Sequence, residues 1–599
     1  MRVRVAVAQI RPTKADYADN LRRVESVLVD IASWAEPPDL VVFPETVMSG
    51  YFLEGGVRDV AVTAGTLMRD LARLHADSGA PALDVAIGFY EEFRNQYYNS
   101  ALYASLGGAA EVQHVHRKVF LPTYGLFDEH RFVEPGSRVY AFDTRWGRAA
   151  MLVCEDAWHS ITGTLAALDG AQLILVLSAA PARGVAPAEG CPAEVQSRPA
   201  SVERWERLVQ HMAEEHGVFV VLAQLVGFEG GKGFQGSSTV VGPNGLVLAR
   251  GPVFEEAVLE ADIELDAITR ARAAQPLLSD LETQLLNLLR SIDTDRVEAK
   301  YDAARDPADG LATPPQAELP SMVGGESPDP MSVDCDLTSR WLVAFLRDEV
   351  VRRRGFNKGI VGLSGGVDSA LTATLAAQAL GPENVIGVRM PYRTSSQESL
   401  EHAELVANRL GICLETVDIT AAVDGYVDAA HGDTNPTRRG NVMARLRMVA
   451  LFDLSAKYDA LPLGTGNKTE RLLGYYTWHA DDSPPVNPLG DLFKSQVRQL
   501  AKYVGVPEVI LAKPATADLV EGQTDEGDLG ITYDVADRIL HYLLKGLQRH
   551  QIVALGFPAA DVDLVSDRLN STHWKRRLPT VALVSGTAIG ESYLRPVDY

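Results

Sequence analysis

Three side chains in the first part of the chain are of types that suit acyl transfer. Glu45 lies in VVFPETV, directly after an apolar run, Lys118 lies in HRKVFLP, and Cys154 ends the apolar run of MLVCEDAWH. A thiolate is the nucleophilic form of cysteine, but a free thiol has a pKa of about 8.5, so it needs a base or a cation nearby. Glu45 can take the thiol proton and later activate water, and Lys118 can stabilise an oxyanion. Glu129 follows Lys118 in the same segment and is expected to hold it in place.

Each of these residues alone would be ordinary. A single cysteine in an apolar strand is usually a small buried hydrophobic residue, and a glutamate at a strand end is usually solvated. The three contexts together are different, because the FPE, HRK and CED motifs occur in one chain in this order. In this respect residues 1–265 resemble the nitrilase superfamily, whose Glu-Lys-Cys triad lies in such contexts.

The segments YGLFDEHR and CEDAWH resemble those of the glutaminase branch of that superfamily, which is fused to NAD synthetases. The resemblance implies a fold of two sheets covered by helices, and hydrolysis of glutamine at Cys154. Ala180 stands where the family has a serine before the proline of its glutamine-binding turn, so neighbouring residues are included as candidates. The residues expected to bind glutamine are Tyr124, Glu129, Ser178 and Arg183.

A second group of residues suits the binding of an anion. GLSGGVDS follows the apolar run KGIV and precedes a helical pattern. Glycines allow the backbone to turn tightly and to direct successive N–H groups at a phosphate, and the helix dipole adds to this. A glycine cluster alone is more often a turn without a ligand, but its place between a strand and a helix favours a ligand. The loop consists of Gly362, Leu363, Ser364, Gly365, Gly366, Val367, Asp368 and Ser369.

This loop lacks the lysine of a GxxxxGK[ST] motif. It resembles instead the pyrophosphate loop of ATP-pyrophosphatases, which split ATP between the α and β phosphates. That resemblance implies ATP as co-substrate and Mg²⁺ held by Asp368 and Glu470. Besides the loop, the residues that it implies for ATP are Thr465, Lys494 and Thr516.

GTGNKTE after an apolar run, followed by NPLGDLFK, resembles the NAD synthetase family specifically. The resemblance covers nearly the whole chain and implies glutamine-dependent amidation of nicotinic acid adenine dinucleotide through an acyl-adenylate, with ammonia delivered internally. It also implies a homo-oligomer that pairs through the synthetase domains, with an octamer among the larger assemblies. Trp478 and Pro485 stand near places where many members carry charged residues, so the mononucleotide is kept as an alternative substrate. The residues expected to contact the dinucleotide are Arg445, Trp478 and Lys575.

Three other functions compete with this interpretation. One is the same mechanism acting on a different carboxylate. Another is a nitrilase-type amidase with a degenerate ATP domain, which the intact SGGVDS and GNKTE motifs disfavour. The third is a nucleotide sensor without turnover, which the joint presence of Glu45, Lys118 and Cys154 disfavours.

The elements that must position these residues follow from hydrophobic patterning. Residues 1–265 alternate short Val/Ile/Leu runs with helical patterns, which predicts a sandwich of mixed sheets covered by helices. The resemblance implies that this is a nitrilase-like α-β-β-α sandwich. Residues 266–330 begin with a helical pattern and continue into a Pro- and Gly-rich linker. Residues 331–599 alternate strands and helices in the manner of a doubly wound, Rossmann-like parallel sheet. The fold class is therefore α/β in both domains.

Composition limits the partners. The chain has 599 residues, a formal net charge of -23 and 46% hydrophobic residues, so it can form large cores but should repel nucleic acids and anionic membranes. Its 4 cysteines are widely spaced, without a CxxC pair, which argues against a disulfide framework or a zinc module. The N-terminus lacks an apolar signal core. We expect a cytoplasmic enzyme that acts on small molecules.

Overall fold

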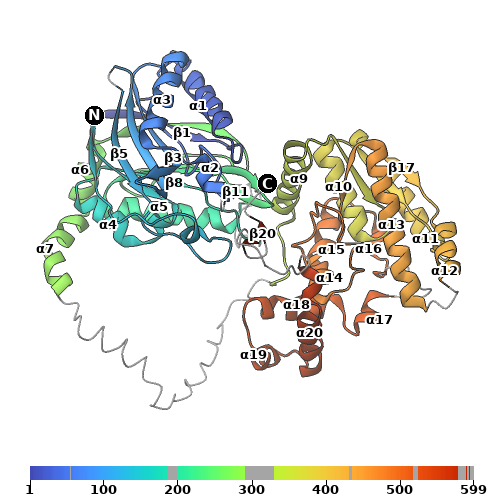
Figure 1. Ribbon diagram of the computed structural model, residues 1–599. Coiled ribbons are helices and arrows are strands. Elements are labelled where there is room, and N and C mark those ends of the chain that lie inside the picture. Colours follow the sequence, from blue (N-terminus) through green and yellow to red (C-terminus); the bar gives the residue numbers. More distant parts are fainter. Residues whose placement is uncertain are drawn as a thin grey trace.

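The structure is a computed structural model of the chain, and it is described here for residues 1–53, 56–108, 110–185, 198–290, 329–430, 435–516, 524–577, 588–589 and 592–593. The N-terminal part forms two layers of strands between helices, and the C-terminal part forms a smaller sheet among many helices (Figure 1). Most of the predicted linker, residues 291–328, lies outside the described residues.

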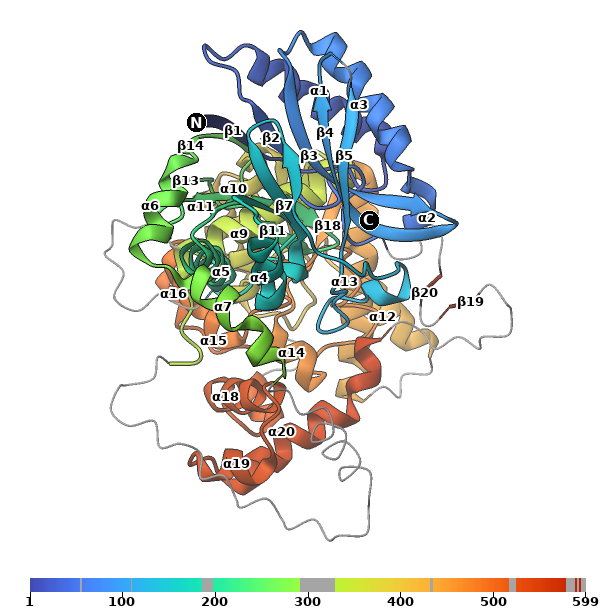
Figure 2. The same ribbon diagram turned by 90° about the vertical axis from the view of Figure 1, so that its left-hand side faces the viewer.

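The first N-terminal sheet has six strands in the order β14-β1-β2-β3-β4-β5. β1 pairs in parallel with β2 and antiparallel with β14, so the sheet is mixed. Helices α1 (Tyr17–Ala32) and α3 (Ala64–Ser78) cover its outer face with their buried apolar residues (Figure 2). The strands are β1 (Arg2–Gln9), β2 (Leu40–Val42), β3 (Leu83–Phe93), β4 (Gln96–Leu106), β5 (Glu111–Arg117) and β14 (Ala257–Glu264), and the short helix α2 (Val57–Val60) follows β2.

The second sheet also has six strands, in the order β13-β12-β9-β8-β7-β6. Its centre, β7-β8-β9, is parallel, and the turn that contains Asn244 joins β12 and β13 as an antiparallel hairpin. The strands are β6 (Phe142–Thr144), β7 (Gly147–Val153), β8 (Leu173–Ser178), β9 (Phe219–Gln224), β12 (Thr239–Val241) and β13 (Val247–Arg250). The helices that follow or cover it are α4 (Ser160–Leu168), α5 (Ala200–His216), α6 (Asp266–Ala274) and α7 (Leu277–Arg290).

One apolar core joins the two sheets. Inward side chains of β1 and β2, such as Val7 and Val42, share a cluster with Leu175 of β8 and Val221 of β9. The opposite faces of β1 and β2 pack on α1 and α3. The predicted α-β-β-α sandwich is therefore confirmed, and it brings the ends of strands from both sheets together.

The C-terminal sheet is parallel throughout, in the order β17-β16-β15-β18. Helices lie on both faces, since α9, α10 and α15 pack with one cluster and α13 with another. This confirms the doubly wound arrangement. The strands are β15 (Lys358–Gly362), β16 (Val385–Arg389), β17 (Cys413–Thr416) and β18 (Ala460–Leu463).

The helices of this domain are numerous because long segments separate the strands. They are α9 (Cys335–Arg347), α10 (Val367–Leu380), α11 (Gln397–Leu410), α12 (Thr420–Ala429), α13 (Pro436–Tyr458), α14 (Lys468–Leu473), α15 (Lys494–Tyr503), α16 (Glu508–Leu511), α17 (Asp525–Leu529), α18 (Tyr533–Leu544), α19 (Arg549–Ala554) and α20 (Ala559–Ser571). Near the C-terminus, β19 (Ala588–Ile589) pairs with β20 (Ser592–Tyr593). In the described part of the chain, helices of a length and apolarity that would let them cross a membrane are absent.

A buried histidine in β5 makes the stability of the N-terminal domain depend on pH. His114 stacks on Phe142, with ring centroids 4.5 Å apart, and burial lowers its pKa to about 4. Between pH 4 and the unfolded pKa of about 6.5, the unfolded chain binds more protons than the folded chain, so stability falls as the pH falls. Between pH 7 and pH 5, we expect the free energy of unfolding of His114→Phe to fall by about 2 kcal/mol less than that of the wild type. Urea unfolding of both proteins at the two pH values measures this, and equal losses would contradict it.

Candidate functional site

Cys154 lies in a sharp turn at the end of β7. The strand ends at Val153, and Cys154 begins a short 3-10 helix, Cys154–Trp158, with a φ of 45°. This left-handed conformation is unfavourable for a residue with a side chain and is often found at functional sites. The turn places the thiol beside Ser178, whose Oγ lies 3.5 Å from Sγ. Ser178, a residue predicted to bind glutamine, thus lies beside the cysteine.

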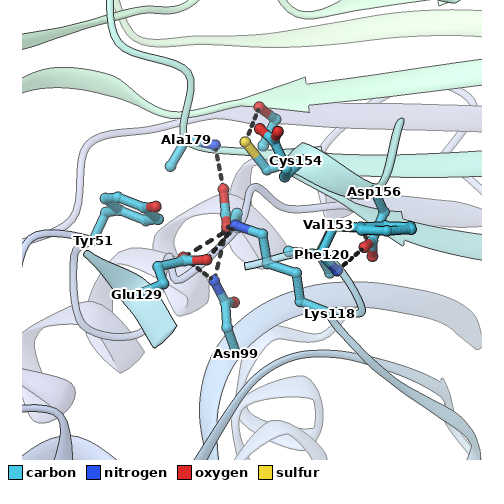
Figure 3. A network of polar contacts seen from close by, with 12 residues as sticks. Tyr51, Asn99, Lys118, Phe120, Glu129, Val153, Cys154, Asp156 and Ala179 are labelled. Carbon is cyan, nitrogen blue, oxygen red and sulfur yellow. Dashed lines mark hydrogen bonds and ion pairs between the residues drawn. The ribbon is translucent and has the colours of Figure 1, made fainter. Parts of the chain in front are cut away.

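Lys118 directly follows β5 and is completely buried between two carboxylates (Figure 3). Its Nζ lies 2.9 Å from Glu45 Oε1 and 2.8 Å from Glu129 Oε2. Glu45 lies in the turn after β2, and Glu129 begins a 3-10 helix, Glu129–Arg131. Gly88 of β3 allows this approach, since a Cβ there would lie 2.5 Å from Pro44 O. The structure therefore brings the predicted base, cation and supporting carboxylate together.

Two further donors fix the carboxylates. Asn99 of β4 donates through Nδ2 to Glu45 Oε1 at 2.8 Å and to Glu129 Oε1 at 2.9 Å. The backbone N–H of Ala179, directly after β8, donates to Glu45 Oε2 at 2.7 Å. Because Ser178 contacts Cys154 and Ala179 contacts Glu45, the end of β8 joins the nucleophile to its base.

Asp156 joins the cysteine turn to the lysine segment. Its carboxylate accepts from the N–H groups of Val119 and Phe120 at 2.9 and 3.0 Å, and from that of Val153 at 3.1 Å. His116 Nε2 lies 2.8 Å from the same group. A single side chain therefore fixes Cys154 relative to Lys118 although they come from different sheets.

The electrostatics favour a neutral thiol at rest. Burial raises the pKa of Cys154 well above its usual range, and the Glu45 carboxylate adds to this rise while Lys118 opposes it. Burial opposes the charged form of Lys118, but Glu129 and Glu45 together raise its pKa well above the usual value. This shift favours the charged form of Lys118, so Glu45 is the candidate base. The arrangement suits proton transfer from Cys154 to Glu45 during attack on a carbonyl.

The other residues predicted for glutamine lie further from the thiol. Tyr124 is exposed, and its hydroxyl donates to Glu155, the residue after Cys154, at 2.9 Å. Arg183 is also exposed, and its backbone N–H donates to Ser201 Oγ at 2.9 Å. The described contacts connect Tyr124 with the cysteine turn but do not connect the Arg183 side chain with it.

The glycine loop forms one wall of a cavity of about 320 Å³ in the C-terminal domain. Gly365 has a φ of 75°, and a Cβ there would lie 2.3 Å from Ser399 O, so this position requires glycine. The loop ends at the N-terminus of α10, where Ser369 Oγ donates to Gly366 O at 3.0 Å. Apart from Gly365, every residue predicted for ATP or Mg²⁺ lines this cavity.

Lys494 begins α15 and, like Lys118, is buried between two carboxylates. Its Nζ lies 2.6 Å from Asp368 Oδ2 and 3.1 Å from Glu470 Oε1. Burial raises the pKa of Glu470 to about 7 against the opposing effect of Lys494. Asn467 caps α14 and donates to Asp368 Oδ1 at 2.9 Å. Groups of three or more metal-ligating side chains are absent from the described residues, so Asp368 and Glu470 are a two-carboxylate pair.

The residues predicted for the dinucleotide lie beside the cavity rather than in its lining. Arg445 Nη2 donates to Trp478 O at 3.1 Å, and Trp478 packs edge-on against Trp574 with ring centroids 5.1 Å apart. Lys575 Nζ donates to Gly474 O at 2.8 Å. The cavity is lined there by groups that the sequence reasoning did not select: Arg447, Arg471, Tyr475, Tyr476, Asp482 and Asp525.

The sequence also did not predict the contacts that Asn99, Asp156 and the Ala179 N–H make at the first site. Asp156 belongs to the CED motif, so its place next to the nucleophile was a usable signal. Asn99 has no such signal, because it acts only through the pairing of β4 with β5, in which Ser100 lies opposite Arg117.

Comparisons with known proteins match both domains. A carbon-nitrogen hydrolase family model matches residues 4–273, and an NAD synthase family model matches residues 338–579. The glutamine-dependent NAD(+) synthetase of Thermotoga maritima is 31% identical over 618 aligned residues, which cover 100% of this chain and 98% of that protein. The chain belongs to the glutamine-dependent NAD(+) synthetase family.

Other relatives match one domain or the whole fold. The NH(3)-dependent NAD(+) synthetase of Trichlorobacter lovleyi is 48% identical over 270 residues, 45% of this chain and 98% of that protein. The solved glutamine-dependent NAD+ synthetase of Acinetobacter baumannii, in complex with ADP, superposes with a TM-score of 0.68 at 25% identity, covering 100% of this chain and 98% of that one. A structure from Cytophaga hutchinsonii, with a TM-score of 0.69 at 16% identity over 96% of this chain and 94% of that one, supports the fold alone.

Asp156 offers a test of how the first site is assembled. Asp156→Asn replaces one carboxylate oxygen by an NH₂ group, which cannot accept a hydrogen bond. Either the N–H groups of Val119 and Phe120 or that of Val153 therefore lose their acceptor. We expect the rate of glutamine hydrolysis to fall by about tenfold or more, because Cys154 and Lys118 lose their fixed separation. Ammonia-driven synthesis should stay unchanged. The exposed Asp143→Asn is the matched control, and equal glutaminase rates in the two variants would contradict the assigned role.

Proposed function

We propose that the chain makes NAD⁺ from nicotinic acid adenine dinucleotide, ATP and glutamine. One observation carries this proposal: a buried Glu45–Lys118–Cys154 centre and a glycine-loop cavity with Lys494 occur in one chain. The family to which the chain belongs combines the same two domains.

At the first site, Cys154 attacks the side-chain amide carbon of glutamine while Glu45 takes the thiol proton. Lys118 and the surrounding donors stabilise the negative oxygen of the tetrahedral intermediate. Ammonia leaves with a proton from Glu45, and a thioester remains on Cys154. Glu45 then activates a water molecule, which releases glutamate and restores the thiol. Glu129 keeps Lys118 charged and in place throughout.

At the second site, the nicotinate carboxylate attacks the α-phosphate of ATP, which gives an acyl-adenylate and pyrophosphate. The glycine loop and the α10 N-terminus direct N–H groups at the phosphates, and Lys494 neutralises charge that develops there. Ammonia then attacks the acyl carbon, and AMP leaves. Adenylation is needed because a carboxylate by itself has no good leaving group.

Mg²⁺ fits the donor chemistry of this cavity. Asp368 and Glu470 face the same ammonium, and Mg²⁺ is usually held by one or two carboxylates together with substrate phosphates. When bound, the ion would supply Lewis-acid neutralisation of the phosphate charge. Asp368 and Glu470 are the residues that would hold it.

The remaining assignments concern delivery and partners. Ammonia passes internally from Cys154 to the second site, because at neutral pH bulk ammonia is mostly protonated and not nucleophilic. Arg445, Trp478 and Lys575 contact the dinucleotide from beside the cavity, where Trp478 offers a ring for stacking. The homo-oligomer and the cytoplasmic location stay predictions.

The first site is tested by Cys154→Ala. We expect glutamine-driven NAD⁺ formation to fall by about 10³-fold or more, because no thioester can form. Synthesis from added ammonium should keep the wild-type rate. Cys413→Ala, an exposed cysteine of β17, is the control. Intact glutamine-driven turnover in Cys154→Ala would reject the assignment.

The second site is tested by Lys494→Met. Loss of the ammonium should lower synthesis from both glutamine and ammonia by about 10²-fold, since the developing phosphate charge is then less well stabilised. ATP–pyrophosphate exchange that depends on the dinucleotide should fall in parallel. Lys502→Met, at an exposed position of the same helix, should behave as wild type. If Lys494→Met catalysed ATP–pyrophosphate exchange at the wild-type rate, Lys494 would have no role in adenylation.

A further inference from the structure

A hairpin of the N-terminal domain lies between the cysteine site and the synthetase domain. It consists of β10 (Val226–Glu229) and β11 (Lys232–Gln235), which pair with Glu229 opposite Lys232. The hairpin is not part of either six-stranded sheet, and β11 is hydrogen-bonded to residues 180–182, which follow β8. At its tip, Glu229 contacts the side of the cysteine site, and Gly231, two residues later, contacts the synthetase side.

Towards the cysteine site, Glu229 holds a segment of backbone. Its carboxylate is 5% exposed and accepts from the N–H of Tyr51 at 3.0 Å and from that of Phe52 at 2.8 Å. Lys14 Nζ lies 4.0 Å from the same carboxylate. The carbonyl of Tyr51 accepts from the Tyr90 hydroxyl at 2.8 Å, so this residue is fixed at both ends of its backbone.

The held segment is part of the wall around the buried lysine. Lys118 Nζ lies 5.6 Å from the centre of the Tyr51 ring, within the range of a cation–π contact. Tyr51 and Phe52 both pack against Phe127, with ring centroids 6.0 and 6.4 Å away, and Phe127 packs against Tyr124. A shift of residues 51–52 would therefore move the wall that faces Lys118 and reaches the residue predicted to bind glutamine.

Towards the synthetase domain, the same hairpin meets the end of α9. The N–H of Gly231 donates to Glu349 Oε1 at 3.3 Å. Phe228 packs edge-on against Phe345 of α9, with ring centroids 6.1 Å apart. Nearby, Arg11 forms an ion pair with Asp348 across the same domain boundary. Glu349 is buried, and its carboxylate also pairs with Arg353, 3.0 Å from Oε1, and with Arg354, so the acceptor that meets Gly231 is fixed by its own domain.

We propose that Glu229 is a positioning residue that transmits the contact between Gly231 and Glu349 into the wall of the cysteine site. Glu229 touches no reacting atom. It sets where residues 51–52 lie, and Glu349 sets where the hairpin lies. The inference rests on the proposed glutaminase function of Cys154 and adds to it a dependence on the synthetase domain.

The first experiment compares Glu229→Ala and Glu229→Gln in the full-length protein, with glutamine hydrolysis measured in the presence of ATP and the dinucleotide. We expect Glu229→Ala to lower kcat/KM for glutamine by about tenfold, since two backbone donors lose a charged acceptor. Glu229→Gln retains one oxygen acceptor and should restore part of the loss. Ammonia-driven synthesis should stay at the wild-type rate in both variants, which also shows that they fold. Glu92→Gln, an exposed carboxylate of β3, is the control.

The second experiment is a double-mutant cycle with Glu349→Ala. Alone, this variant should lower kcat/KM for glutamine roughly threefold, because the Gly231 N–H loses its acceptor, and Glu349→Gln, which keeps one oxygen acceptor, should restore part of the loss. Since Glu349→Ala also removes the partner of Arg353 and Arg354, ammonia-driven synthesis is measured beside it and should stay near the wild-type rate. Combined with Glu229→Ala, Glu349→Ala should cause no additional loss, because both residues act through one hairpin. The proposal would be overturned if the losses of the two single variants multiplied in the double variant, or if Glu349→Ala left kcat/KM for glutamine unchanged. If instead the wild-type protein hydrolysed no glutamine, the proposed function itself would fail, so the two failures are distinguishable.

Discussion

The burial of the Lys118 ammonium between Glu45 and Glu129 is the constraint on which the first site depends. A buried charge is costly unless it is paired and hydrogen-bonded, and removing one partner of such a pair is strongly destabilising. Here two carboxylates share one cation, so further donors are needed, and they come from Asn99 and the Ala179 N–H. These donors lie on β4 and at the end of β8. The charge cluster can therefore form only when both sheets have their observed register.

The second cavity uses the same arrangement for a different purpose. Lys494 also lies between two carboxylates, Asp368 and Glu470, but there the pair faces a cavity lined by the glycine loop. When ATP binds, an ammonium that is shared in this way can exchange a carboxylate partner for a phosphate oxygen. At the first site Lys118 is completely buried and held by Glu45 and Glu129, which suits a residue that must stay charged while the thiol of Cys154 reacts.

The sequence predicts much of this arrangement. The apolar runs locate the main strands, and the motifs around Glu45, Lys118, Cys154 and the glycine loop predict both sites. The sequence does not predict the short strands β6, β10, β11 and β13, because three or four residues carry too little alternation to be distinguished from loops. Nor does it predict the longer strands β5 and β14, whose charged and polar residues interrupt the apolar runs. It also does not predict Asn99, whose role arises from the pairing of β4 with β5 and from the approach of a turn 54 residues away.

We propose that nitrogen freed at Cys154 reaches the acyl-adenylate without passing through solvent. The most direct measurement gives the enzyme ATP, nicotinic acid adenine dinucleotide and glutamine labelled with ¹⁵N in its side-chain amide, in a buffer that contains unlabelled ammonium. Mass spectrometry of the product then reports the source of its amide nitrogen. We predict NAD⁺ enriched in ¹⁵N far beyond the ratio of labelled to unlabelled ammonia in solution. Product that matches the bulk ratio, or no amidated dinucleotide at all, would contradict the account.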